Sequence, residues 1–288
     1  MFISERLIYL ELPKTACSHI RDLLQALVGG EIVGKHNPIS LSLCQQNKCI
    51  IGSIRNPWDW YISLWAFGCD GKGSLYKRLI SRQIKGNGLV MSKNEQLVLS
   101  PLDITLTILE SFRKSVKTYR KVYSDSKDSS MFREWLKIIL DLNSTKKYSF
   151  GDGYAFSPIS SYAGLYTYYY IRLFSKSTAG IYGEEVATED KLVAFDRTQN
   201  SLHEVIRIEN LEEDLVNILK RLNYDIDESK LENILKFKPD WHKNKQTKTN
   251  SSSRVKAIEY YYDQETSDLV AEKEKFIIKK YGYIAPEI

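Results

Sequence analysis

The segment from Arg6 to Ile20 reads RLIYLELPKTACSHI, and the expected fold follows from it. Its first half, Leu7 to Leu12, is an apolar, alternating run typical of a buried strand. Pro13 ends this strand, because proline has no N–H to donate to a neighbouring strand. A helical pattern of apolar residues then begins at Ile20. The segment therefore predicts a strand that passes through a short turn into a helix.

The turn carries one lysine and two hydroxyl side chains, on Lys14, Thr15 and Ser18. The amino end of a helix presents backbone N–H groups and a positive dipole end, which together favour a bound anion. A lysine and hydroxyls add a charge and more donors. An ordinary turn, with Ser18 as the helix N-cap and Lys14 in solvent, explains the same residues equally well. The Walker A loop of nucleotide kinases is absent, since no glycine stands between Pro13 and Ile20.

The composition is that of an ordinary globular chain with a mild positive charge. Its 288 residues can bury one large α/β core or two modest domains. The formal net charge of +5 suits anionic ligands but falls short of the basic face expected of a nucleic-acid binder. No apolar run reaches the ~18–20 residues that span a bilayer, and no leader is recognisable. We therefore expect a cytoplasmic protein without a membrane span.

The four cysteines lie in the first quarter of the chain and lack CxxC spacing. They are Cys17, Cys44, Cys49 and Cys69. Free thiols are the expected state, and nothing in the sequence demands an oxidising compartment. A zinc site formed by Cys44, Cys49 and His36 is the alternative.

A second strand-to-helix segment runs from Lys48 onward. Lys48 to Arg55 (KCIIGSIR) is a nearly continuous apolar run, typical of a parallel strand covered on both faces. Asn56 and Pro57 are suited to begin a helix, as N-cap and first residue. Two such segments predict an α/β fold with a parallel sheet. Because ligands bind at the carboxyl ends of such strands, Lys14 and Arg55 would meet there if the strands are neighbours.

Later segments add helices and one further strand. The strand is predicted over Glu204 to Glu209, with Asn210 capping the helix after it. The predicted helices are Leu102 to Val122, Met131 to Leu142, Leu211 to Leu222, Ser229 to Phe237 and Gln264 to Tyr281. Tyr154 to Phe174 is dense in aromatic residues, which either pack in the core or line an acceptor pocket. Pro239 to Arg254 is polar and basic, either a solvated linker or a lid that closes on an anion.

The two strand-end motifs resemble those of sulfotransferases that use 3′-phosphoadenosine 5′-phosphosulfate (PAPS). The motifs are PKTACSHI and IRNPWDWYISLW, and the likeness is greatest to the carbohydrate-type branch, which includes the heparan sulfate 2-O-sulfotransferases and bacterial relatives. RIENLEEDL and the segment NSSSR…YYYDQETSDLVAEKEKFIIKKYGY are similar to late parts of that family, whereas Gly68 to Asp190 matches no part of it. The resemblance implies a P-loop-NTPase-like parallel sheet flanked by helices. It also implies a single sulfotransferase domain over residues 1–288, with a helical, aromatic insertion at about 70–190.

The resemblance also implies roles for particular residues. The 5′-phosphosulfate would be held by Pro13, Lys14, Thr15, Ala16, Cys17, Ser18 and His19. Lys14 would neutralise the leaving phosphate, and Arg55 and Ser63 would bind the 3′-phosphate, for which a guanidinium fork is suited. Residues closing over the cofactor would be Asn250, Ser251, Ser253 and Arg254. Without a ligand, Arg55 would instead pair with a surface carboxylate and Ser63 would be an ordinary helix residue. Two residues depart from the family pattern: Ala16 stands where glycine is common, and His19 where a second Ser or Thr is usual.

His36 is the candidate general base implied by the resemblance, since histidine titrates near the working pH. His19 and Glu209 are the alternatives. The expected reaction transfers the sulfuryl group from PAPS to a hydroxyl, on a saccharide by family likeness, and leaves adenosine 3′,5′-bisphosphate (PAP), with no metal. Two other functions stay open: a P-loop-type small-molecule kinase, and a catalytically inactive relative that binds a sugar or a protein.

Overall fold

The computed structural model describes residues 1–81, 115–141, 143, 153–226 and 257–288. The chain packs as two compact units. The first holds Met1–Asn56, Arg172–Lys176 and Gln199–Ser251, and the second holds Pro57–Ile171, Ser177–Thr198 and Ser252–Ile288. Two such units can belong to one domain, so the single-domain expectation stays a prediction.

A five-stranded sheet lies at the centre of the first unit, in the order β3-β1-β2-β4-β5. Its strands are β1 (Phe2–Ile3), β2 (Leu7–Leu10), β3 (Glu31–Ile32), β4 (Cys49–Ile54) and β5 (Glu204–Arg207). β2, β4 and β5 run parallel, whereas β1 is antiparallel to both β2 and β3. The α/β class is thus confirmed, but the sheet is mixed, and the prediction of a parallel sheet is wrong for β1, which pairs antiparallel with both of its neighbours. The cause is the link between β1 and β2, which is too short for the crossover that parallel strands require.

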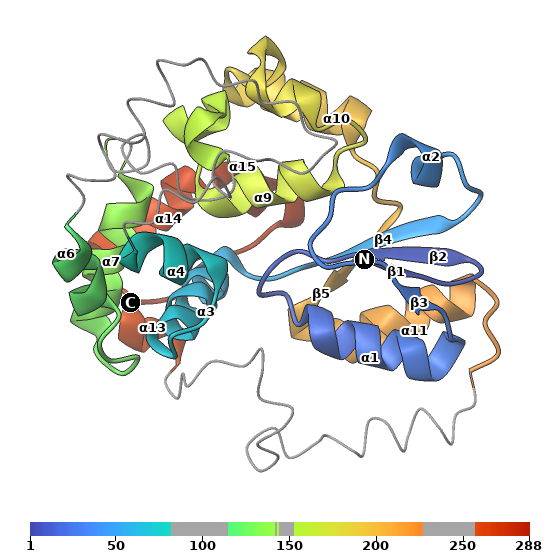
Figure 1. Cartoon of the computed structure of the whole chain (residues 1–288), viewed down its shortest axis with the longest axis horizontal. Helices are drawn as coiled ribbons and strands as arrows, with labels where there is room; N and C mark the ends of the chain where they lie inside the picture. The colour runs from blue at the N-terminus through green and yellow to red at the C-terminus, as the bar shows by residue number, and fades with distance from the viewer. Residues whose placement is uncertain (82–114, 142, 144–152, 227–256) are drawn as a thin grey trace. The chain divides into compact units, whose positions relative to one another are not determined.

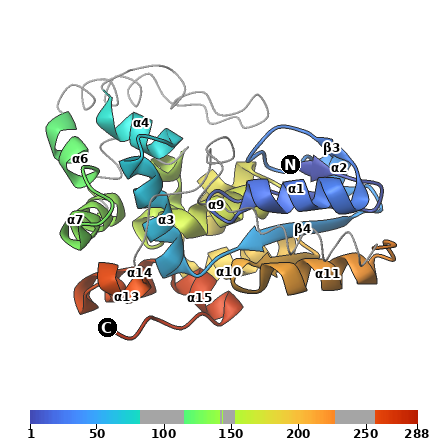
Figure 2. The same ribbon diagram turned by 90° about the horizontal axis from the view of Figure 1, so that it is seen from below.

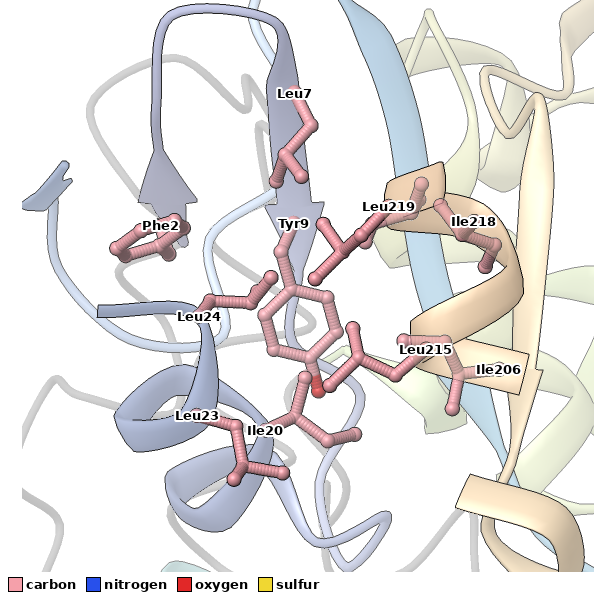
Figure 3. Packing of buried hydrophobic residues seen from close by; sticks show 11 residues of the cluster. Phe2, Leu7, Tyr9, Ile20, Leu23, Leu24, Ile206, Leu215, Ile218 and Leu219 are labelled. Carbon is pink, nitrogen blue, oxygen red and sulfur yellow. The ribbon is translucent and has the colours of Figure 1, made fainter. Parts of the chain in front are cut away.

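Helices α1 (Cys17–Val28) and α11 (Leu211–Arg221) cover one face of this sheet (Figure 1). Figure 3 shows the ring of Tyr9 amid these contacts, between side chains of the two helices. The buried cluster consists of Phe2, Leu7, Tyr9, Ile20, Leu23, Leu24, Ile51, Ile206, Leu215, Ile218 and Leu219. Each of these aliphatic side chains contributes about 1.5–3 kcal/mol by leaving water. The amphipathic patterns that predicted both helices therefore correspond to one shared core.

The opposite face of the sheet is tightly packed at Gly52 of β4. A Cβ atom at this position would lie 2.9 Å from both Phe174 Cζ and Leu202 Cδ2. Since successive strand residues point to opposite faces, Ile51 and Ser53 point toward α1 and α11. The contact explains why the apolar run of β4 is interrupted by a glycine.

The second unit is helical in its described part. It contains α3 (Pro57–Cys69), α4 (Ser74–Ile80), α6 (Val116–Val122), α7 (Ser129–Leu140), α13 (Ile258–Tyr261), α14 (Gln264–Lys273) and α15 (Lys275–Tyr281), with most of α9 (Leu165–Phe174) and α10 (Glu189–Gln199). Figure 2 shows α13, α14 and α15 following one another near the carboxyl end. Aromatic residues of α3 fill the interior, and the Trp60 ring stacks on Tyr166 with centroids 4.7 Å apart. α3 begins at Pro57, as the sequence predicts, and has Asp59 in its first turn.

The single helix predicted over Gln264 to Tyr281 is wrong, because the chain forms α14 and α15 with a break at Glu274. Glu274 is fully buried, and its carboxylate accepts hydrogen bonds from the Tyr61 hydroxyl, the Thr167 hydroxyl (2.6 Å) and the Thr167 N–H (2.8 Å). The Tyr166 N–H donates to the same group at 3.2 Å. These N–H groups belong to the first turn of α9, so Glu274 caps that helix from a distant part of the chain.

Other predicted strands and helices are present in the structure but begin or end at different residues. The strand at Glu204 ends at Arg207 and continues as a 3-10 turn, η6 (Ile208–Asn210). Asn210 does precede α11, but its side chain makes no capping hydrogen bond. The prediction over Met131 to Leu142 corresponds to α7, and the end of that over Leu102 to Val122 to α6. Residues 102–114, Ser229 to Phe237, and 239–254 lie outside the described residues.

Candidate functional site

The turn between β2 and α1 is the first part of the candidate site. α1 begins at Cys17, and Ala16 is its N-cap residue. The Ile20 N–H donates to the Ala16 carbonyl at 3.1 Å, which is the first bond of the helical ladder. Ser18 is therefore inside the first helical turn, and the alternative that made it the N-cap is wrong. Ser18 and His19 are both partly exposed at this amino end.

The backbone of the turn is held in a rare conformation. Lys14 has φ 66° and Ala16 has φ 54°, both in the left-handed region. Such residues cost about 1–3 kcal/mol and persist only where the surrounding structure enforces them. Ala16 in this region is followed directly by the right-handed residues of α1, and such a sequence of conformations turns successive N–H groups toward one point. The turn has the backbone shape of an anion cradle.

Arg55 lies at the same edge of the sheet. β2 and β4 are parallel neighbours, with Leu10 opposite Gly52, so their carboxyl ends meet. The Arg55 Nη1 group donates to the Lys14 carbonyl at 3.1 Å. The structure thus joins the two strand-end motifs that the sequence placed 41 positions apart.

The side chains of Thr15 and Cys17 point into the protein. The Thr15 hydroxyl donates to the Leu12 carbonyl at 2.6 Å, and the Cys17 thiol donates to the same carbonyl at 2.7 Å. Both residues are buried, and burial raises the pKa of the Cys17 thiol above its ordinary value. Any contact that these two residues make with a ligand must therefore come from the backbone.

His36 lies beside the end of the same strand. Its Nδ1 atom is 2.8 Å from the Glu11 carbonyl oxygen. Because a carbonyl can only accept, Nδ1 carries the proton and the neutral ring keeps a lone pair on Nε2. Burial lowers the pKa of His36, which favours that neutral form. This tautomer is the one that a general base acting through Nε2 requires.

The two alternative bases are placed differently. Glu209 uses one carboxylate oxygen to accept the Asn56 N–H at 2.6 Å, and so anchors the residue after Arg55. His19 is on the first turn of α1, and burial lowers its pKa as well. The ring orientation of His36 is fixed by its main-chain partner, the Glu11 carbonyl, just after β2.

The remaining predicted site residues belong to other parts of the chain. Ser63 belongs to α3 in the second unit, where it is buried. Asn250, Ser251, Ser253 and Arg254 lie outside the described residues. The four cysteines are free thiols. Over the described ranges, no three His, Cys, Asp or Glu side chains are placed to hold a metal ion, which excludes the zinc alternative with His36.

The aromatic segment is mainly core. Five of its tyrosines are at most 5% exposed, namely Tyr154, Tyr166, Tyr168, Tyr169 and Tyr170. Phe156 and Tyr162 are partly exposed, and the Tyr162 hydroxyl donates to the Val186 carbonyl at 2.7 Å. An acceptor-lining role is therefore limited to few of these rings.

Two residues beneath the turn were missed in the sequence. Ser53 contacts both Thr15 and Tyr9 through hydrogen bonds of 2.7 Å. A serine inside the apolar run CIIGSI was the available signal, because a buried hydroxyl needs a partner. Tyr9 carried no such signal, since tyrosine is common in strands.

Comparisons of the chain with protein-family models, curated proteins and solved structures find no match. In the part of the chain that the structure describes, no helix has the length and apolar character needed to cross a membrane.

Proposed function

We propose that this protein is a PAPS-dependent sulfotransferase that transfers the sulfuryl group to a hydroxyl, on a saccharide acceptor. The observation that carries the proposal is the hydrogen bond from Arg55 Nη1 to the Lys14 carbonyl, which brings two cationic residues to one sheet edge. PAPS carries anionic groups at both its 5′ and 3′ positions, and two cations on adjoining turns match that pattern. In the same proposal, β2, β4 and β5 are the parallel core of a P-loop-like fold.

The turn before α1 fits the 5′-phosphosulfate. Its left-handed residues Lys14 and Ala16 and the amino end of α1 form a cradle of the kind that binds anions. The Lys14 side chain adds a full positive charge. Arg55 supplies a planar group suited to the 3′-phosphate. Ser63 keeps its proposed role at that phosphate, and Asn250, Ser251, Ser253 and Arg254 their proposed role over the cofactor.

The proposed chemistry uses a base and a cation at opposite ends of the transfer. The acceptor hydroxyl gives its proton to Nε2 of His36, and its oxygen forms a bond to sulfur. The bond from sulfur to the bridging phosphate oxygen breaks, and Lys14 neutralises the charge that develops on this oxygen. PAP leaves as the product. As in phosphoryl transfer, positioning and charge stabilisation supply most of the rate, and no metal has a role in the proposal.

The first test is ligand-dependent thermal unfolding with PAP and, separately, with ATP and magnesium. PAP at a hundred times its dissociation constant should stabilise the native protein by about 2.7 kcal/mol. Arg55→Ala should abolish the shift. Arg6→Ala is the matched control, because Arg6 also donates to carbonyls, those of Leu222 and Asn223, but precedes β2 at its other end. A shift with ATP alone would instead indicate a kinase.

The second test isolates the base. His36→Asn keeps a side-chain N–H for the Glu11 carbonyl, and asparagine tolerates the left-handed φ of 54° at this position. We expect PAP to bind as before while the release of PAP from PAPS, over a panel of saccharides, falls by about 10²–10⁴-fold. In the wild type, the transfer rate should fall on acidification only below pH ~6.5, the ordinary pKa of histidine, because burial lowers the pKa of His36.

Unchanged turnover in His36→Asn would remove His36 as the base and leave His19 and Glu209. PAP binding by the wild type without turnover on any acceptor would favour the inactive binding protein.

A further inference from the structure

A chain of three hydroxyl groups runs beneath the turn that precedes α1. The Tyr9 hydroxyl is 2.7 Å from Ser53 Oγ, and Ser53 Oγ is 2.7 Å from Thr15 Oγ1. Thr15 Oγ1 in turn donates to the Leu12 carbonyl at 2.6 Å. Tyr9, Thr15 and Ser53 have no exposed surface. The chain joins β2, β4 and the turn at one buried point.

The direction of this chain follows from its last member. The Leu12 carbonyl can only accept, so the single proton of Thr15 is donated to it. Thr15 Oγ1 must then accept from Ser53, and Ser53 must accept from Tyr9. The Ser53 hydroxyl also donates to the Thr15 carbonyl at 3.2 Å, so its single proton is shared between two oxygen atoms of Thr15. The hydrogen bonds therefore all run toward the turn, from Tyr9 to Ser53, from Ser53 to Thr15 and from Thr15 to the Leu12 carbonyl.

The chain ends where the backbone is strained. The Leu12 carbonyl takes a second hydrogen bond from the Cys17 thiol at 2.7 Å, which fixes the start of α1 as well. Between these two anchored points stand Lys14 and Ala16, both with left-handed φ. Backbone strain of this kind requires surrounding contacts that enforce it. Buried, fully paired hydroxyls provide such contacts, because breaking one leaves a polar group unsatisfied.

We infer that Tyr9 and Ser53 are positioning residues of the anion cradle, acting through Thr15 and without touching the ligand. The inference rests on the proposed function for the identity of the anion. The hydroxyl chain itself is a property of the fold. Its direction also sets an order of importance: Ser53→Ala removes the donor to Thr15, whereas Tyr9→Phe leaves that donor in place.

The first unit also contains a matched control pair, Ser4 and Tyr224, outside the hydroxyl chain. The hydroxyl of Tyr224 lies 2.7 Å from Ser4 Oγ and accepts the Arg6 N–H at 3.0 Å, at the amino end of β2. Ser4→Ala and Tyr224→Phe thus delete the same chemical groups at the end of the sheet away from the turn. Any general loss of stability should appear in both pairs.

The experiment measures two quantities on all four variants and the wild type. The first is amide hydrogen exchange in the peptide that spans residues 13–20, and the second is the dissociation constant for PAP. We expect Ser53→Ala to exchange about tenfold faster there and to bind PAP about tenfold more weakly, with a smaller change in Tyr9→Phe. Ser4→Ala and Tyr224→Phe should leave both quantities as in the wild type.

The outcomes separate the inference from the proposed function. Unchanged exchange in Ser53→Ala would overturn the inference whether or not PAP binds. Faster exchange with unchanged PAP affinity would overturn it too, because the turn would then not position the ligand. If the wild type fails to bind PAP while exchange rises only in the Tyr9 and Ser53 variants, the proposed ligand is wrong and the support of the turn by this chain stands.

Discussion

Ala16 shows why glycine would suit the turn before α1. With φ 54° it occupies a conformation that costs an L-residue with a Cβ about 1–2 kcal/mol. From the sequence we could note only that Ala16 replaces a common glycine, and expect a less close approach to a phosphate. The structure adds a backbone cost at this residue, which is present without any ligand.

Ala16→Gly should therefore raise the free energy of unfolding, by up to about 1 kcal/mol after the extra freedom of glycine in the unfolded chain is subtracted. Ala26→Gly in the last turn of α1 is the control, because Ala26 is a right-handed helical residue, where glycine should cost up to about 1 kcal/mol. Chemical denaturation of both variants measures the two changes. If both substitutions change the free energy of unfolding in the same direction, the backbone of Ala16 is not strained.

The inward side chains of Thr15 and Cys17 could not have been predicted from the turn sequence. Hydroxyl and thiol groups beside a helix start are equally suited to a ligand or to a carbonyl of the same chain. The choice depends on Ser53 and Leu12, which the sheet brings close only after folding. The position of Lys14 and Arg55 was predictable, because parallel neighbours place their following residues at one edge.

At the scale of elements, the break between α14 and α15 depends on one buried carboxylate. The amphipathic pattern over Gln264 to Tyr281 is continuous, so the local sequence does not predict two helices. Glu274 has φ −107° and ψ 19°, outside the helical range, and four donors surround its side chain. Those donors come from α3 and α9, far away in the sequence, which is why the pattern alone predicted one helix.

Glu274 should make stability depend on pH. Burial raises the pKa of Glu274 to about 7 from an ordinary value of 4.5. Below pH 4.5 Glu274 is protonated in both the folded and the unfolded protein. As the pH rises from about 4.5 to about 7, Glu274 loses its proton more readily in the unfolded protein, so the free energy of unfolding falls. The fall amounts to about 3 kcal/mol. Denaturation curves at several pH values measure the slope.

Glu274→Gln is the variant for this measurement, because its side chain does not titrate. It should lose the slope between about pH 4.5 and 7 even though its amide fits four donors less well than a carboxylate does. Glu272→Gln on α14 is the control, since that side chain is not part of the buried group, and it should keep the slope. If the free energy of unfolding changes with pH equally in Glu274→Gln and in the wild type, the pH dependence comes from other residues.

At the scale of the molecule, local patterns predicted the class of the fold but not the antiparallel pairings in its sheet. The apolar runs of β2 and β4 and the helices after them carried the α/β prediction, and the structure has both. β1 and β3 are only two residues long, too short to give a period, so their antiparallel pairing was not foreseen. A helical, aromatic insertion was predicted at about 70–190, but not that α3 and the carboxyl-terminal helices belong to the same unit. Their aromatic contacts join segments that share no sequence pattern.

The hydrogen bonds of Glu274 also have a consequence for the order of folding during synthesis. Its partners Tyr61 and Thr167 precede it by 213 and 107 positions. A ribosome adds about 5–20 residues per second, so Tyr61 waits about 10–40 seconds for this carboxylate. Thr167 is made later and waits about 5–20 seconds, and during that time the first turn of α9 lacks this cap.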